Sequence, residues 1–287
     1  MPIQDRSELA VRAALEVAEA YGVRAREPYV LSDGANLLLH LRPAPIIARV
    51  TTLTGQVRPD IDARLVREVS LVEFLYDLGA PVVPPSPELP AGPHRSGAVA
   101  FTFWTFVDHP VREVADVATV GVMLRELHQA LRGYPGELPY LATPLVDIAR
   151  YLEPSAGLAS IGDDDRARLA EAFSRIAAAV NSLETSVQPV HGDAHPGNML
   201  HTSAGWCWVD FEDACSAPVG WDLACLALTS RLDGREALPF YGDRPSDDEL
   251  APLLALRRLH TTVWANLMAD RFPRFRDHAE ERLAEWR

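Results

Sequence analysis

The spacing of apolar residues changes near residue 107, and this change constrains the fold more than any other feature of the sequence. Before it, short apolar or β-branched runs separated by turn residues predict an antiparallel meander, with strands over 29–31, 36–41, 46–50 and 98–107. After it, helical spacing dominates, over 117–131, 163–183, 221–232 and 248–270. We therefore predict an α+β fold, in which a small β-rich lobe of residues 1–107 precedes a larger, mainly helical lobe of residues 108–287.

Two helices are expected inside the first lobe. Ser7 is a suitable N-cap for a helix that ends before Gly22. Leu65 and Val69 belong to a helical pattern over 62–78, which Gly79 ends.

The charge of the chain disfavours several kinds of partner. The formal net charge is −13, and residues 1–107 contribute −2 of it, from 10 arginines and 12 acidic residues. Residues 108–287 contribute −11, from 17 arginines and 28 acidic residues. Nucleic-acid phosphates and anionic membrane surfaces both require a positive surface, so we expect neither as a partner. All 27 basic residues are arginine, which excludes a P-loop and lysine-based covalent catalysis.

The sequence also predicts where the chain resides. Its first residues lack the apolar core of a signal peptide, and its longest nearly apolar run, 97–107, is too short to cross a bilayer. Cys207, Cys215 and Cys225 are odd in number and form no CxxC pair, so we expect buried free thiols and no disulfide framework. We expect a cytoplasmic protein.

The segment His191-Gly192-Asp193-Ala194-His195-Pro196-Gly197-Asn198 carries the strongest chemical signal. It follows an expected strand and enters a hairpin around 203–205, whose return strand leads to Asp210. Phosphoryl transfer requires one carboxylate to orient the attacking hydroxyl, and an amide oxygen plus a second carboxylate to hold magnesium. Asp193, Asn198 and Asp210 match this requirement, and protein kinases space their catalytic Asp and Asn by the same interval.

Together with Val209-Asp210-Phe211-Glu212 and Gly220-Trp221-Asp222-Leu223-Ala224, this segment resembles the aminoglycoside-phosphotransferase and choline-kinase superfamily. The resemblance implies a bilobal, protein-kinase-like fold. It further implies that Asp193 is the catalytic base, that Asn198 and Asp210 bind Mg²⁺, and that His191 and Asp222 support the loop.

The first lobe resembles the same family more loosely. Arg49 stands where kinases usually have a phosphate-binding lysine, and Glu68 stands at the position of its acidic partner. The resemblance also implies a nucleotide-covering loop and a hinge that contacts the base, with nucleotide-binding residues Ser32, Gly34, Asn36, Thr105 and Val107.

Several alternatives remain open at this point. The loop around Asp193 could be a capped turn without chemistry, and Arg49 could be a solvated cation. Glu68 could pair with Arg64 on its own helix. Asp247, Asp248 and Glu249 could bind substrate or could be acidic residues that favour a helix N-terminus.

Two other functions compete with a kinase. His191, Asp193 and His195 offer three ligands for a metallohydrolase. A catalytically silent kinase-like module that binds nucleotide is the second alternative, since the usual lysine is missing. We expect a phosphotransferase that uses Mg²⁺ and either ATP or GTP, with a small hydroxyl acceptor. The acidity of the second lobe favours a cationic acceptor such as an aminoglycoside or amino sugar.

Overall fold

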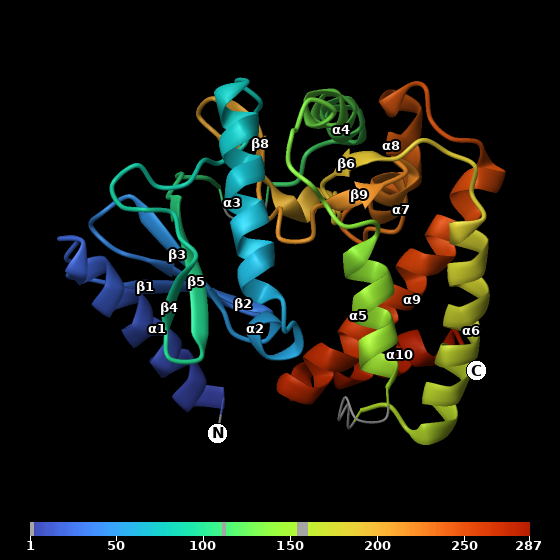
Figure 1. The fold of residues 1–287 in the computed structure, drawn as a ribbon, viewed down its shortest axis with the longest axis horizontal. Helices are drawn as coiled ribbons and strands as arrows, with labels where there is room; N and C mark the ends of the chain where they lie inside the picture. The colour runs from blue at the N-terminus through green and yellow to red at the C-terminus, as the bar shows by residue number, and fades with distance from the viewer. Residues whose placement is uncertain (1–2, 111–112, 154–159) are drawn as a thin grey trace. The chain divides into compact units, whose positions relative to one another are not determined.

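The computed structural model describes residues 3–110, 113–153 and 160–287, and the chain forms two compact units. The first unit comprises Met1–Glu113 and Leu200–Glu212, and the second comprises Val114–Met199 and Asp213–Arg287. The predicted α+β class is confirmed, because a small antiparallel sheet dominates the first unit and helices dominate the second (Figure 1).

The first unit contains a five-stranded antiparallel sheet of order β1-β2-β3-β5-β4. Its elements are α1 (Ile3–Ala20), β1 (Tyr29–Asp33), β2 (Asn36–His40), β3 (Ile46–Thr51), α2 (Thr54–Val57), α3 (Ile61–Asp77), β4 (His94–Ser96) and β5 (Val99–Thr105), with the hairpin of β7 (Met199–Thr202) and β8 (Gly205–Trp208). The four strands expected from the sequence are present as β1, β2, β3 and β5.

The two faces of this sheet pack against different helices. Alternate residues of a strand point to opposite faces. Phe101 and Phe103 of β5 belong to the core formed with α1, whereas Ala100 packs with Ile61 and Leu65 of α3. The helices α1 and α3 therefore cover opposite faces of the sheet (Figure 1).

The second unit is built around one long helix. Its elements are α4 (Val117–Leu131), α5 (Ala142–Leu152), α6 (Asp163–Asn181), β6 (Gln188–Val190), η2 (Pro196–Asn198), β9 (Cys215–Ala217), α7 (Gly220–Ala227), α8 (Gly234–Tyr241), α9 (Asp247–Arg271), η3 (Pro273–Phe275) and α10 (Arg276–Ala284). The helix α9 packs against α5, α6, α7 and α10, and β6 pairs antiparallel with β9.

Some helix predictions were wrong or incomplete. The first helix begins at Ile3, so Ser7 is not its N-cap, and the Ser7 hydroxyl donates to Asp33 Oδ2 at 2.6 Å. The helix expected over 221–232 ends at Ala227. Sequence analysis missed α5, α8 and α10. Pro144 and Pro239 lie within α5 and α8, where proline obscures the helical signal.

Among the helices of the described ranges, none has the length and apolar character that a membrane span requires.

Buried apolar side chains of α3 should dominate its contribution to the stability of the first unit. Leu75 is fully buried, whereas Val66 on the same helix is 52% exposed. We predict that Leu75→Ala lowers the free energy of unfolding by ~2–5 kcal/mol. Val66→Ala is the matched control and should change it by less than ~0.5 kcal/mol. Urea unfolding followed by circular dichroism measures both, and equal losses would contradict the packing described for α3.

The cysteines provide a second check on the packing. Cys207, Cys215 and Cys225 are buried thiols outside any disulfide, as the sequence predicted. Burial raises the pKa of the Cys207 thiol to about 11 and raises the pKa of Cys225 strongly, so at neutral pH these thiols stay protonated. We predict that a disulfide reagent at pH 7.5 modifies the native protein only slowly and titrates three thiols after denaturation. Rapid modification of the native chain would contradict this burial.

Candidate functional site

The loop of residues 191–198 is held by the buried carboxylate of Asp222, in the first turn of α7. Its Oδ2 accepts the His191 N–H and its Oδ1 accepts the Gly192 N–H, each at 2.8 Å. Asp222 is fully buried, so without these donors its charge would lack compensation. The carboxylate therefore fixes two successive peptide groups at the start of the loop.

A chain of buried hydrogen bonds extends from this carboxylate. His128 of α4 contacts Asp222 Oδ2 through Nε2 at 2.9 Å and the Tyr241 hydroxyl through Nδ1 at 2.8 Å. The indole of Trp221 donates to the Gly192 carbonyl at 2.8 Å. Burial raises the pKa of Tyr241 to about 12, with the Asp222 charge adding to the effect. Helices α4, α7 and α8 thus all fix the beginning of the loop.

Gly192 is required in this loop for two reasons. Its φ of +89° is a conformation that residues with a Cβ rarely adopt. A Cβ at this position would also lie 1.9 Å from the carbonyl oxygen of Asp213. The sharp turn at Gly192 directs the chain into Asp193.

Asp193 and Asn198 lie together in the second unit. The Asn198 amide nitrogen donates to the Asp193 carbonyl at 2.9 Å and approaches its Oδ2 at 3.4 Å. Arg257 of α9 donates to Asp193 Oδ1 at 2.5 Å. Burial alone would raise the pKa of Asp193, but Arg257 and His195 outweigh it and hold the pKa well below its usual range. Asp193 is therefore ionised at neutral pH.

The histidines of the loop make local hydrogen bonds. Nδ1 of His191 accepts the Asp193 N–H at 3.3 Å, and Nδ1 of His195 accepts the Gly197 N–H at 2.9 Å. Nε2 of His195 then lies 3.4 Å from Asp193 Oδ2. In the described ranges, no three His, Cys, Asp or Glu side chains are arranged to hold a metal ion. The metallohydrolase alternative gains no support from this arrangement.

Asp210 belongs to the first unit, where it joins a cluster of buried charges. Arg49 of β3 lies between Ala48 and Val50, which face α1, so its side chain points to the opposite face, toward α3. Its Nη1 donates to Glu68 of α3 at 2.5 Å, and its Nη2 donates to Asp210 Oδ1 at 2.6 Å and to Glu212. Arg49 is therefore not a solvated cation.

Glu212 is the second centre of this cluster. It accepts from Arg58 at 2.5 Å and from the Asn36 amide at 2.8 Å, in addition to Arg49. Burial would raise the pKa of Glu212, but Arg49 and Arg58 outweigh it, and the pKa is lowered. Arg64 pairs with Asp60, and Glu68 accepts from Arg49.

The cluster contains three carboxylates and two arginines, so it has one acidic group more than it has basic groups. Glu68 is the carboxylate whose pKa is raised. Burial raises the pKa of Glu68 to about 8, and the charges of Asp210 and Glu212 add to the shift while Arg49 opposes it. Asp210 differs from the other two because its side chain is 45% exposed and its φ is +68°. This uncommon backbone conformation at a polar residue is typical of functional positions.

The remaining nucleotide-binding candidates lie at the edge and end of the sheet. Ser32 is in β1, Gly34 is in the turn that follows, and Asn36 opens β2 and bonds Glu212. The Thr105 N–H donates to the Pro84 carbonyl at 3.0 Å, and the Val107 carbonyl contacts His109 Nδ1 at 2.9 Å. These two backbone groups already have protein partners.

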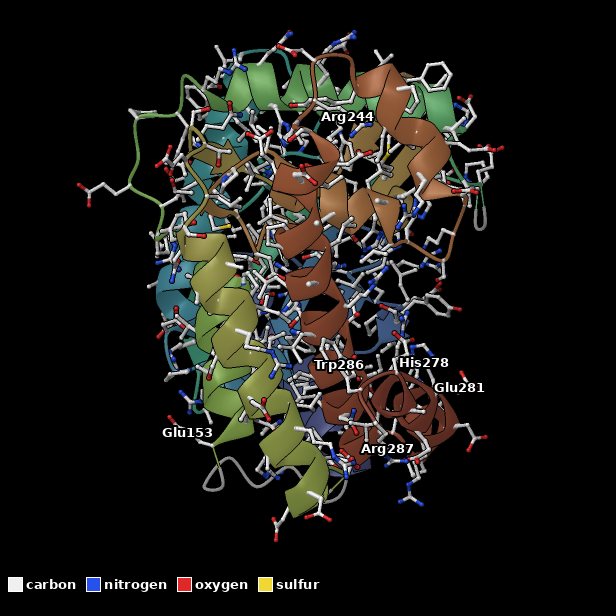
Figure 2. The ribbon with its side chains drawn as sticks, turned by 90° about the vertical axis from the view of Figure 1, so that its right-hand side faces the viewer. Glu153, Arg244, His278, Glu281, Trp286 and Arg287 are labelled. Atoms are coloured by element: carbon white, nitrogen blue, oxygen red, sulfur yellow. The ribbon has the colours of Figure 1, made fainter. Side chains whose placement is uncertain are left out.

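The acidic residues 247–249 form the first turn of α9, which Figure 2 shows with Arg244 near its beginning. Ser246 and Glu249 make a capping box, and Glu249 Oε2 accepts the Ser246 N–H at 2.8 Å. Asp247 pairs with Arg244 at 2.8 Å. The structure thus shows these residues acting at a helix N-terminus, and their contact with a substrate stays a prediction.

Sequence analysis assigned no role to several residues that belong to the hydrogen-bond network around the loop 191–198 or to the charge cluster around Arg49: Arg58, Glu212, His128, Tyr241 and Arg257. Glu212 alone had a sequence signal, because it lies two residues after Asp210. The others are distant in sequence from the residues they contact.

A family model described as a phosphotransferase enzyme family matches residues 49–253, and the chain belongs to this family. No curated protein matches the chain in sequence.

Solved structures with the same fold cover nearly the whole chain. An amicoumacin kinase, in complex with AMP-PNP, Ca²⁺ and amicoumacin, is 15% identical, with 96% of each chain covered and a TM-score of 0.65. The GDP and kanamycin complex of APH(2″)-IIIa is 16% identical, with 95% of this chain and 96% of that chain covered and a TM-score of 0.64. The choline kinase LicA from Streptococcus pneumoniae is 16% identical, with 94% and 98% covered and a TM-score of 0.63.

The contact between Gly192 and Asp213 leads to a test of the loop. We predict that Gly192→Ala distorts the loop and lowers both stability and any turnover. Gly205→Ala is the matched control, because Gly205 also has a positive φ, +109°, but no atom lies within 4 Å of the added Cβ. The control should lose only ~1 kcal/mol of stability, the strain of the backbone conformation. Equal effects of the two substitutions on thermal unfolding would contradict the close approach.

Proposed function

We propose that the chain is a kinase that transfers the γ-phosphoryl group of ATP or GTP to a hydroxyl of a small molecule. The observation that carries this proposal is the fixed position of Asp193. Its loop is tied to Asp222 at two peptide groups, its side chain is held by Arg257, and Asn198 bonds its carbonyl. Such rigid placement of one ionised carboxylate suits the orientation of an attacking hydroxyl.

In this proposal the first unit binds the nucleotide. Arg49 supplies a guanidinium for the phosphates, and Glu68 orients it, with a contact of 2.5 Å. The segment containing Ser32, Gly34 and Asn36 covers the phosphates. Backbone groups near Thr105 and Val107 contact the base, which requires the Thr105 N–H to exchange its present partner.

Asn198 and Asp210 are the residues that would hold Mg²⁺, and their chemistry fits this ion. The Asn198 amide nitrogen is engaged by Asp193, which leaves its amide oxygen for a hard cation. Asp210 bonds Arg49 through Oδ1, which leaves Oδ2 on a side chain that is 45% exposed. The hairpin of β7 and β8 begins directly after Asn198 and ends shortly before Asp210. Bound magnesium would offset negative charge on the transferred phosphoryl group.

Asp193 would orient the acceptor hydroxyl by accepting its hydrogen bond. A carboxylate with a lowered pKa is a weak base, so we expect the hydroxyl proton to pass to Asp193 late, as the new oxygen–phosphorus bond forms. The bond between the γ-phosphorus and the bridging oxygen breaks in the same step, and the nucleoside diphosphate leaves. Positioning and electrostatics then supply most of the rate enhancement.

The test is turnover of ATP or GTP with magnesium by the purified protein, across amino sugars, aminoglycosides, choline and neutral small alcohols. We predict acceptor-dependent turnover that Asp193→Ala lowers by about 10²–10⁴-fold, with nucleotide affinity nearly unchanged. Asp164→Asn, an exposed residue in the first turn of α6, is the control and should keep full turnover.

Each outcome separates the candidate functions. Nucleotide binding without turnover on any acceptor would favour the silent binding module. Wild-type turnover by Asp193→Ala would remove Asp193 from the chemistry.

A further inference from the structure

Arg257 is a buried cation that contacts the proposed catalytic carboxylate, and the sequence motifs assign it no role. It lies near the middle of α9, is 9% exposed, and donates from Nη2 to Asp193 Oδ1 at 2.5 Å. Its guanidinium lies 6.0 Å from the centre of the Trp221 ring. Trp221 directly precedes Asp222, the carboxylate that holds the loop. The loop and α9 are thereby joined at the side chain that would orient the acceptor.

His260 is a further neighbour of Arg257 on α9. Its Nδ1 lies 3.4 Å from Arg257 Nη1, and its Nε2 accepts the indole N–H of Trp264 at 2.8 Å. The guanidinium is therefore enclosed by side chains of its own helix as well as by the loop that contains Asp193.

The contact also decides which oxygen of Asp193 remains for the acceptor. Arg257 occupies Oδ1, whereas within the described part of the chain Oδ2 has two long contacts, to Asn198 Nδ2 and to His195 Nε2, each at 3.4 Å. A hydroxyl donor at normal distance would make a shorter hydrogen bond than either. Oδ2 is therefore the oxygen available to an acceptor, with its direction set by the bond on Oδ1.

The ion pair of Arg257 and Asp193 affects whether a cationic or a neutral acceptor is favoured at this carboxylate. An isolated carboxylate would attract a cationic group, but Arg257 compensates this carboxylate at direct contact. The acidic residues at the start of α9 are bonded to Arg244 and Ser246 or form the first turn of the helix. The overall negative charge of the second unit is therefore not concentrated at the Asp193 carboxylate.

We propose that Arg257 is a positioning and specificity residue, which directs Oδ2 of Asp193 and neutralises its charge, so that the hydroxyl accepted here belongs to an uncharged part of the acceptor. This inference rests on the proposed kinase function. It differs from the cationic acceptor expected from net charge, because a positive group adjacent to the reacting hydroxyl would approach a cation already in place.

Kinetics of Arg257 variants test this role. Arg257→Ala should lower kcat by about 10²-fold, the usual cost of a misplaced catalytic group, and leave the KM for nucleotide unchanged. Arg257→Lys should recover part of the loss, and millimolar guanidinium should partly rescue Arg257→Ala. Arg258→Met is the control, because Arg258 is the next residue on α9 and is exposed.

Matched acceptors test the specificity. With glucosamine and glucose, or choline and its neutral carbon analogue 3,3-dimethylbutan-1-ol, the wild type should show no preference for the cationic member. Arg257→Ala should shift kcat/KM toward the cationic member, since Asp193 then lacks its partner. A purely structural role would lower stability without this shift and without rescue, and that result would overturn the proposal.

A double-mutant cycle separates this inference from the proposed function. Urea unfolding of Asp193→Asn, Arg257→Ala and the double variant should reveal strong coupling between the two side chains. Absence of coupling would overturn the contact itself. Coupling in a protein without any turnover of nucleotide would instead remove the kinase function, and with it the acceptor role of Arg257, while the ion pair remained.

Discussion

The positions of the candidate residues in the second unit depend on the hydrogen bonds of one fully buried carboxylate, that of Asp222. Two peptide N–H groups donate hydrogen bonds to this carboxylate, and the ring of His128 contacts it. A different path of the loop 191–198 would leave the buried carboxylate without the two peptide donors, which is unfavourable. The penalty for leaving a buried charge uncompensated couples the loop to α4 and α7. Asp193 is the next residue after Gly192, so the hydrogen bonds from His191 and Gly192 to Asp222 also fix its position.

Charge compensation by arginine organises the candidate residues of both units. In the first unit, Arg49 and Arg58 compensate three carboxylates, and the pKa of Glu68 is raised to about 8, mainly by burial. In the second unit, Arg257 compensates Asp193. A chain without lysine uses the planar guanidinium here, which can bond several carboxylates at once. A single arginine such as Arg49 can therefore hold carboxylates from two other segments, α3 and residues 210–212.

Much of the fold could be predicted from the sequence, and so could the proximity of two candidate site residues, Asp193 and Asn198. The change from strand spacing to helical spacing identified an α+β chain, and four strands and the main helices followed from it. Asp193 and Asn198 could be found because their interval is local. The helices α5 and α8 were missed because proline lies within them, and Ser7 was assigned to a cap because the residues before it carry a weak apolar pattern.

The sequence by itself determined the division into a β-rich part followed by a helical part, the glycine at the turn before Asp193, and the spacing of the loop residues. These are properties of neighbouring residues, for which backbone conformation and side-chain period are sufficient. Only the tertiary structure decided which cation meets which carboxylate. Arg257 is 64 residues from Asp193, and Arg49 is 163 residues from Glu212. Such contacts depend on which faces of helices and strands pack together, and no local pattern in the chain records that choice.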